Sequence, residues 1–215
     1  MKKTCSARRL LGAAVALCLA VMAAGCSVGE NTSDANDNEA NEANEDGPVV
    51  TGNRTELVKA LLTLEDVPEG LRRNTPGPND PAYQPDFYSC AQITRNLIRH
   101  VYVSFGPRRI SRILGHYVLQ YRDTAAAQSA FANIQPEAFQ CSGLSEPSEL
   151  RGFPDFGEES IAIQFRNREV NSLTRHVYIR RANLITLVFY REEDVLEELA
   201  AIADERLAEL VDTAQ

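Results

Sequence analysis

The stretch LTRHVYIRRANLITLVFY, residues 173–190, decides the fold that this sequence predicts. β-Branched and aromatic residues fill both of its halves, which is typical of strands. Between the halves stand Ala182 and Asn183, at the place where a tight hairpin turn would reverse the chain. The stretch therefore predicts two antiparallel strands, 173–181 and 184–190, joined by a short turn.

Further strands are indicated upstream by an alternation of apolar and polar side chains, which has the period of two that a strand has. Apolar side chains recur at every second position in 101–105 and again in 161–165. Gly106 and Pro107 give a turn signal after the first of these segments, and the segment 112–122, RILGHYVLQYR, follows as its partner. Together with the hairpin, these segments predict about five strands.

Two pentapeptides repeat within the predicted strands. RHVYV occupies residues 99–103 and RHVYI occupies residues 175–179, in corresponding strand contexts. The repeat suggests the hypothesis that the domain contains a duplicated structural unit.

Three helices are predicted from apolar faces and capping residues. Asn53 and Glu56 have the spacing of a capping box, and so do Asp194 and Glu197. The dipeptide Asp-Thr at 123–124 caps the middle helix. The predicted helices cover 54–64, 124–134 and 194–211. Their order among the strands predicts an α+β fold, in which helices flank an antiparallel sheet and pack on one side of it.

The first 25 residues have the pattern of a secretory signal. A basic start precedes an apolar run, 10–24, which is shorter than the roughly 20 residues needed to span a bilayer. Cys26 follows a pair of small residues, and this junction resembles the bacterial lipobox, at which a peptidase cleaves before the cysteine. The resemblance implies that Cys26 carries diacylglycerol and an acyl chain such as palmitate. An ordinary signal with an incidental cysteine is the alternative, and Arg8-Arg9 leaves the twin-arginine export route open.

Residues 26–47 follow as an acidic tether. The segment 27–47 contains seven Asp and Glu residues and neither Lys nor Arg. It has almost no apolar surface to bury, so we expect it to be disordered. The remaining residues, 48–215, have the length of one domain. The net charge of −8 argues against a nucleic-acid partner. We expect a lipid-anchored protein on the extracytoplasmic side of the cell membrane.

The five cysteines divide by position. Cys5 and Cys18 lie in the signal and Cys26 is the lipidation site, which leaves Cys90 and Cys141. An even pair in an exported chain is typical of a disulfide bond. A thiolate nucleophile or a metal ligand would need a reducing compartment or closely spaced cysteine pairs, and the sequence indicates neither.

Several stretches together resemble a known family. They are LLTLEDVPEGL (61–71), the strand 117–121 running into RDTAAAQSAFANI, FGEESIAIQF (156–165), VYIRRANLITLV (177–188) and LAAIADERLAEL (199–210), with Cys90 and Cys141 between them. They resemble the extracellular sensor-type domain of actinobacterial lipoproteins and of mycobacterial receptor Ser/Thr kinases of the PknH type. The resemblance implies an antiparallel sheet with flanking helices and a cleft for an unidentified ligand, and the family has no established catalytic activity. The kinase domains have more than one disulfide, whereas this chain has cysteines for one.

Catalytic motifs are absent from the sequence. It contains no nucleophile elbow, dinucleotide fingerprint, phosphate loop or zinc-protease motif, so we expect no enzymatic activity, no cofactor and no metal. His100, His116 and His176 lie in predicted strands and could bind zinc only if their side chains met. Glu158 and Glu159 are adjacent, so we expect them on opposite faces of the chain as it approaches a strand.

Aromatic and arginine residues are the better candidates for a ligand surface. The candidates are Tyr83, Phe87, Tyr88, Arg108, Arg109 and Arg112. The aromatic residues lie in a proline-rich loop, and loops of this length inside a domain are often functional. The arginines lie near the first β-turn and could bind carboxylate or phosphate. The alternative is that the aromatic residues cover the edge of the core while the arginines pair with Asp and Glu.

Three classes of function follow. The first is a monomeric membrane-anchored lipoprotein whose domain binds an unidentified small ligand or cell-envelope component in a cleft. The second is a protein–protein interaction module of the cell envelope, which requires a flat apolar patch. The third is a secreted metal-dependent enzyme, which requires the three histidines to converge. We expect the first.

Overall fold

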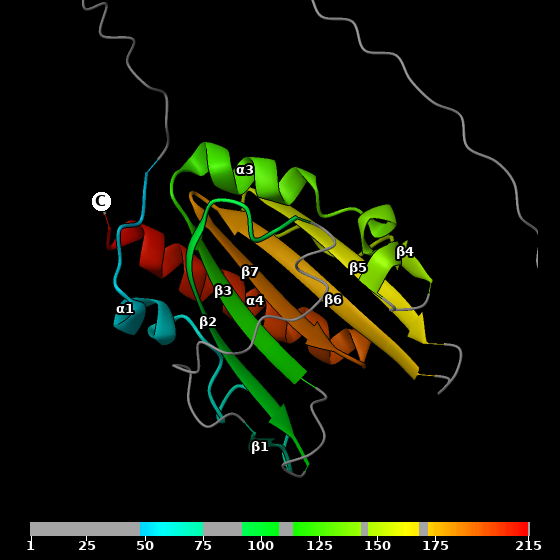
Figure 1. The fold of residues 1–215 in the computed structure, drawn as a ribbon. Helices are drawn as coiled ribbons and strands as arrows, with labels where there is room; N and C mark the ends of the chain where they lie inside the picture. The colour runs from blue at the N-terminus through cyan, green and yellow to red at the C-terminus, as the bar shows by residue number, and fades with distance from the viewer. Residues whose placement is uncertain (1–47, 75–91, 108–113, 143–145, 168–171, 215) are drawn as a thin grey trace, which may run out of the picture. The chain divides into compact units, whose positions relative to one another are not determined.

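The computed structural model describes residues 48–74, 92–107, 114–142, 146–167 and 172–214. These residues form one antiparallel sheet in the order β1-β2-β3-β7-β6-β5-β4 (Figure 1). Its strands are β1 (Arg72–Arg73), β2 (Leu97–Gly106), β3 (Leu114–Tyr121), β4 (Pro147–Glu149), β5 (Glu159–Asn167), β6 (Ser172–Arg181) and β7 (Leu184–Tyr190). The helices are α1 (Arg54–Lys59), α3 (Thr124–Ala132), the 3-10 helix η1 (Pro136–Ser142) and α4 (Glu193–Asp212).

The α+β class and the five predicted strands are confirmed. The hairpin of β6 and β7 turns at Ala182 and Asn183, with Arg181 opposite Leu184. The two additional strands, β1 and β4, have two and three residues and form the edges of the sheet. Strands this short contain no repeated alternation, which is why the pattern of the sequence did not reveal them.

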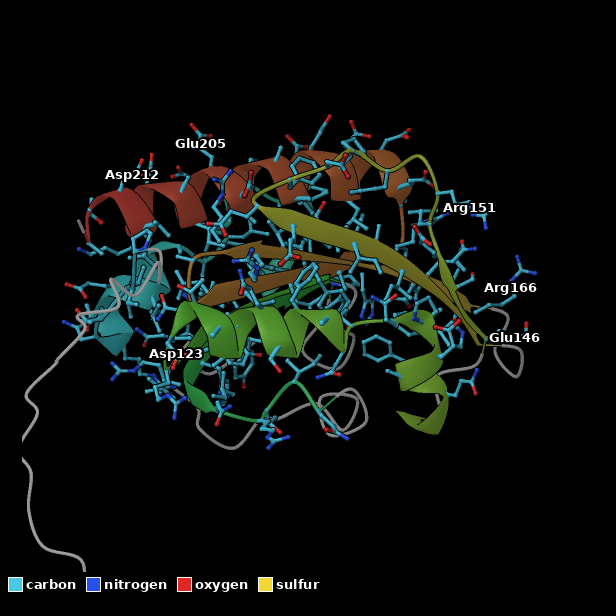
Figure 2. The ribbon with its side chains drawn as sticks, turned by 90° about the horizontal axis from the view of Figure 1, so that it is seen from above. Asp123, Glu146, Arg151, Arg166, Glu205 and Asp212 are labelled. Atoms are coloured by element: carbon cyan, nitrogen blue, oxygen red, sulfur yellow. The ribbon has the colours of Figure 1, made fainter. Side chains whose placement is uncertain are left out.

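The helices cover both faces of the sheet, so the prediction that they pack on one side was wrong. Figure 2 shows α3 and α4 on opposite sides of the strands. Leu57 of α1 and Leu199 of α4 belong to the apolar core on one face. Phe131 of α3 and Phe139 of η1 belong to the core on the other face. The cause is visible in β3, which is buried at every position and therefore needs a cover on each side.

Two of the three predicted caps are confirmed. The side chain of Asn53 accepts from the N–H groups of Thr55 and Glu56, and that of Glu56 completes the capping box. Asp123 caps α3 by accepting from Ala126. The third prediction was wrong, because α4 begins after Glu192, which makes no side-chain cap bond.

The first helix is shorter than predicted, since α1 ends at Lys59 and not at residue 64. The peptide groups that would continue it are bound by distant side chains. The carbonyl of Leu61 accepts from Arg206 at 2.6 Å, and the N–H of Leu62 donates to Nδ1 of His116 at 2.9 Å. Tertiary hydrogen bonds therefore replace the helical ones at this end.

The repeated pentapeptides occupy symmetric places in the sheet. One cross-strand row reads Tyr102, Tyr117, Leu187, Tyr178. The strands β2 and β6 flank the central pair β3 and β7 and run in opposite directions. A twofold rotation about an axis perpendicular to the sheet, between β3 and β7, therefore relates the two repeats. Such a rotation keeps each face on its own side, yet α3 and α4 lie on opposite faces. The symmetry therefore covers the strands but not a complete duplicated unit.

Candidate binding groove

A groove of about 710 Å³ lies between the segment 50–59 and the last turns of α4. Its volume falls within the roughly 300–1,000 Å³ of small-molecule sites. The lining residues are Val50, Thr51, Gly52, Asn53, Glu56, Lys59, Arg206, Glu209, Leu210, Thr213 and Ala214. Both walls thus come from ends of elements that lie far apart in the sequence.

The floor of the groove is the backbone at Val50, and buried amide side chains hold it in place. The N–H of Val50 donates to Oδ1 of Asn183 at 2.8 Å, and the carbonyl of Val50 accepts from Nδ2 of Asn183 at 3.0 Å. The same carbonyl accepts from Nε2 of Gln120 at 2.7 Å. Because Asn183 and Gln120 are themselves buried, these bonds fix the segment before α1 against the sheet.

The α1 wall is fixed by its capping box and by an arginine of β2. Oε2 of Glu56 accepts from the N–H of Asn53 at 2.7 Å, and the carbonyl of Gly52 accepts from Arg99 at 3.2 Å. Lys59, in the last turn of α1, is exposed. The wall therefore combines a rigid backbone with one mobile ammonium group at its end.

The α4 wall is fixed through Arg206. Its guanidinium donates to the carbonyl of Leu61 and, at 2.8 Å, to Oδ1 of Asp66. Burial alone would raise the pKa of Asp66, but hydrogen bonds from Thr63 and the nearby Arg206 together hold it below its ordinary value. The ion pair joins α4 to the loop after α1, so the two walls keep their spacing.

The three histidines do not converge. Leu62, the partner of His116, belongs to the core beneath α4, whereas His176 packs against Phe165 at 4.5 Å and Phe189 at 5.2 Å on the α3 side. Strand alternation puts His100 on the face of Tyr102, again the α3 side. Within the described ranges, no three His, Cys, Asp or Glu side chains are grouped to hold a metal ion.

Burial keeps two of these histidines neutral. It lowers the pKa of His116 to about 3, with a further lowering by the charge of Arg206, and lowers the pKa of His176 to about 3. Both imidazoles therefore stay unprotonated at the second nitrogen near neutral pH.

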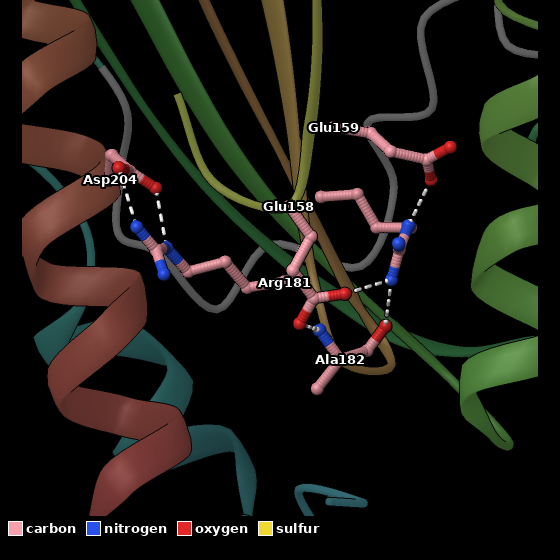
Figure 3. A network of polar contacts seen from close by, with 6 residues as sticks. Glu158, Glu159, Arg181, Ala182 and Asp204 are labelled. Atoms are coloured by element: carbon pink, nitrogen blue, oxygen red, sulfur yellow. Dashed lines mark hydrogen bonds and ion pairs between the residues drawn. The ribbon is translucent and has the colours of Figure 1, made fainter. Parts of the chain in front are cut away.

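The adjacent glutamates meet at one arginine, contrary to the prediction that they point to opposite faces (Figure 3). Glu158 binds the buried guanidinium of Arg180 at 2.6 Å, and Glu159 binds the same group. Strand alternation does not apply, because β5 begins only at Glu159. Glu158 also accepts from the N–H of Ala182, so the pair fastens the β6–β7 turn. Their roles are structural.

The predicted ligand residues lie outside the described residues. They are Tyr83, Phe87, Tyr88, Arg108, Arg109 and Arg112. The lipidation site Cys26 and the cysteine Cys90 also lie outside, whereas Cys141 belongs to η1. The ligand surface, the lipid and the disulfide therefore stay predictions. Sequence reasoning missed the groove, whose lining residues come from two segments far apart in the chain.

Comparisons with known proteins find similarity among solved structures alone. No family model matches the chain, and no curated protein matches it. Among solved structures it is similar to the extracellular domain of PknH from Mycobacterium tuberculosis, with 12% identity and a TM-score of 0.42. The match covers 78% of this chain and 97% of that one. In the described part of the chain, no helix has the length and apolar character that crossing a bilayer requires. We transfer no residue role from the PknH domain.

Proposed function

We propose that this protein is a lipid-anchored, extracytoplasmic lipoprotein whose folded domain binds a small ligand or cell-envelope component, as a monomer and without catalysis. The observation that carries the binding role is the groove of about 710 Å³. Its floor and both walls are fixed by hydrogen bonds before any ligand arrives. A preformed site loses little conformational entropy on binding, which favours affinity.

The anchor is supported by the sequence. The basic start, the apolar run and the small residues before Cys26 together form a lipobox-like junction. One acyl chain gives only marginal membrane binding, whereas a diacylglycerol with a further acyl chain anchors stably. The acidic segment 27–47 has the charge sign of an anionic leaflet, so it favours a domain held away from the surface.

Metabolic labelling with an alkyne-tagged palmitate tests the anchor. Wild-type protein and a Cys18→Ala control, changed within the signal, are expected to incorporate label and to sediment with membranes. Cys26→Ala is expected to lose the label and leave the membrane fraction. Membrane association that persists in Cys26→Ala without label would show that the signal itself remains as the anchor, and label that persists would show that Cys26 is not the lipidation site.

Thermal unfolding with added envelope metabolites and lipids tests the binding role. A ligand that binds the native state raises the melting temperature, by mass action. We expect at least one compound class to raise it in a saturable manner. A library that leaves the melting temperature unchanged throughout would argue against a binding domain.

A further inference from the structure

On the premise that the domain binds a ligand, the charges of the groove indicate what that ligand is. Glu56 and Lys59 of α1 line one wall, and Arg206 and Glu209 of α4 line the other. Residues three apart lie on the same side of a helix, so each wall presents one acid and one base to the groove. The four charges cancel.

Two of the four charged groups already form hydrogen bonds within the protein. Glu56 completes the capping box of α1, and Arg206 binds Leu61 and Asp66. Lys59 and Glu209 are both exposed, and neither forms an ion pair with any residue in the described ranges. These two side chains are therefore available to a ligand, one from each wall.

A ligand with a single charge would pair with Lys59 or Glu209 and desolvate the other without a partner, and a neutral ligand would leave both unpaired. A ligand with both charges avoids both costs. The C-terminal end of α4 carries a partial negative charge and no basic residue in its last turn, which favours an ammonium group there. We propose that the groove binds a small zwitterion, an amino acid or short peptide, with its ammonium at Glu209 and its carboxylate at Lys59.

The rest of the lining fits the body of such a ligand. Val50, Leu210 and Ala214 offer apolar surface, and Thr51 and Thr213 offer hydroxyl groups. Apolar contacts beside a few placed polar groups are the usual composition of small-molecule sites. A dipeptide with two methyl side chains, alanyl-alanine, is therefore a suitable probe.

Calorimetric titration of the full chain in detergent compares alanyl-alanine with two blocked forms. N-acetyl-alanyl-alanine keeps only the carboxylate, and alanyl-alanine amide keeps only the ammonium. We expect the zwitterion to bind at least about tenfold more tightly than either blocked form. Equal affinities for the three peptides, or no binding of alanyl-alanine, would overturn the proposal.

Substitutions test which residue binds the ammonium end of alanyl-alanine and which binds its carboxylate end. Glu209→Gln is expected to lower the affinity for alanyl-alanine to that of the N-acetylated form, and Lys59→Gln to that of the amide. Glu205→Gln is the matched control on α4, because Glu205 is exposed and points away from the sheet (Figure 2). Arg122→Gln, at an exposed base outside the groove, is the control for Lys59→Gln. Equal losses in variants and controls would contradict a site at the groove.

The double variant Lys59→Gln/Glu209→Gln separates this proposal from the general one. A metabolite that raises the melting temperature equally in wild type and double variant would overturn the groove as the site and leave the binding function intact. A metabolite whose effect is lost in the double variant supports both. Failure of every metabolite and of alanyl-alanine in the wild type would remove both.

Discussion

His116 accepts a hydrogen bond from the backbone N–H of Leu62 through Nδ1, at 2.9 Å. Its other nitrogen, Nε2, lies 2.6 Å from the hydroxyl of Thr186, which itself donates to the carbonyl of Tyr117. Because the Thr186 hydrogen is already used, Nε2 must be the donor in that contact. The network thus fixes one neutral tautomer of His116 and ties the loop after α1 to the centre of the sheet.

The stability of the domain is expected to fall as the pH is lowered from 7 to 5. His116 and His176 have pKa values of about 3 in the folded protein, below their ordinary 6.5. Below pH 6.5 the unfolded chain therefore binds more protons, and the folded state loses about 1.4 kcal/mol per pH unit for each histidine until about pH 3. Urea unfolding at pH 7, 6 and 5 measures this slope.

His116→Gln is the control for that slope, because it removes one of the two titrating groups. The variant starts less stable, but its free energy of unfolding is expected to fall by about 1.4 kcal/mol less per pH unit than that of the wild type. An unchanged slope would mean that His116 is not buried in its neutral form.

Gly115→Ala is expected to destabilise the domain by about 1–3 kcal/mol, the range of overpacked cores. A Cβ atom at this position would lie 2.3 Å from Cε1 of Phe189. The ring has little room to move, because it packs against Tyr117 and His176. Denaturant unfolding of the variant gives the loss.

Removing the ring tests whether that clash is the cause. In a Phe189→Leu background, Gly115→Ala is expected to cost less than in the wild-type background, since the obstructing atoms are gone. Strictly additive losses would point to backbone strain and not to the contact with Phe189.

Two buried hydroxyl groups are expected to respond in opposite ways to removal. Oγ of Ser104 is buried and has no hydrogen-bond partner in the described part of the chain, so Ser104→Ala is expected to leave stability unchanged or raise it by up to about 1 kcal/mol. Thr186→Val is expected to cost about 1–3 kcal/mol, because it leaves Nε2–H of His116 unpaired. Thermal unfolding ranks the two variants, and a loss in Ser104→Ala would reveal a partner for its hydroxyl.

Alternation in a strand is a local property, which is why the strands could be predicted from the sequence. Residues 101–105 and 161–165 show their period of two without reference to the rest of the chain. Helix ends are different, because competing partners can lie anywhere. The end of α1 depends on Arg206, which is 145 residues from Leu61.

The groove could not be predicted for the same reason. Its floor requires Asn183 to reach Val50 across 133 residues, and its far wall belongs to the last helix. The side of the sheet on which each helix packs was also undetermined, since both faces of β3 and β7 are buried. Alternation identifies the strands but not the elements that cover them.

The predicted bond between Cys90 and Cys141 can be tested by comparing the stabilities of the two single cysteine variants with that of the double variant. A disulfide closing a loop of this length stabilises the fold by roughly 4 kcal/mol on the chain-entropy model. Cys90→Ala and Cys141→Ala are each expected to lose that amount, and the double variant no more than either, because either change removes the bond. Dithiothreitol is expected to lower the melting temperature of the wild type only.

Alkylation under non-reducing conditions distinguishes the bond from a pair of free thiols. A disulfide leaves neither cysteine to react in the denatured wild-type protein, whereas each single variant exposes one reactive thiol. A thiolate nucleophile or metal ligand would react in the unreduced wild type, and losses in the two single variants would then add. Additive losses together with alkylated wild-type protein would therefore exclude the bond.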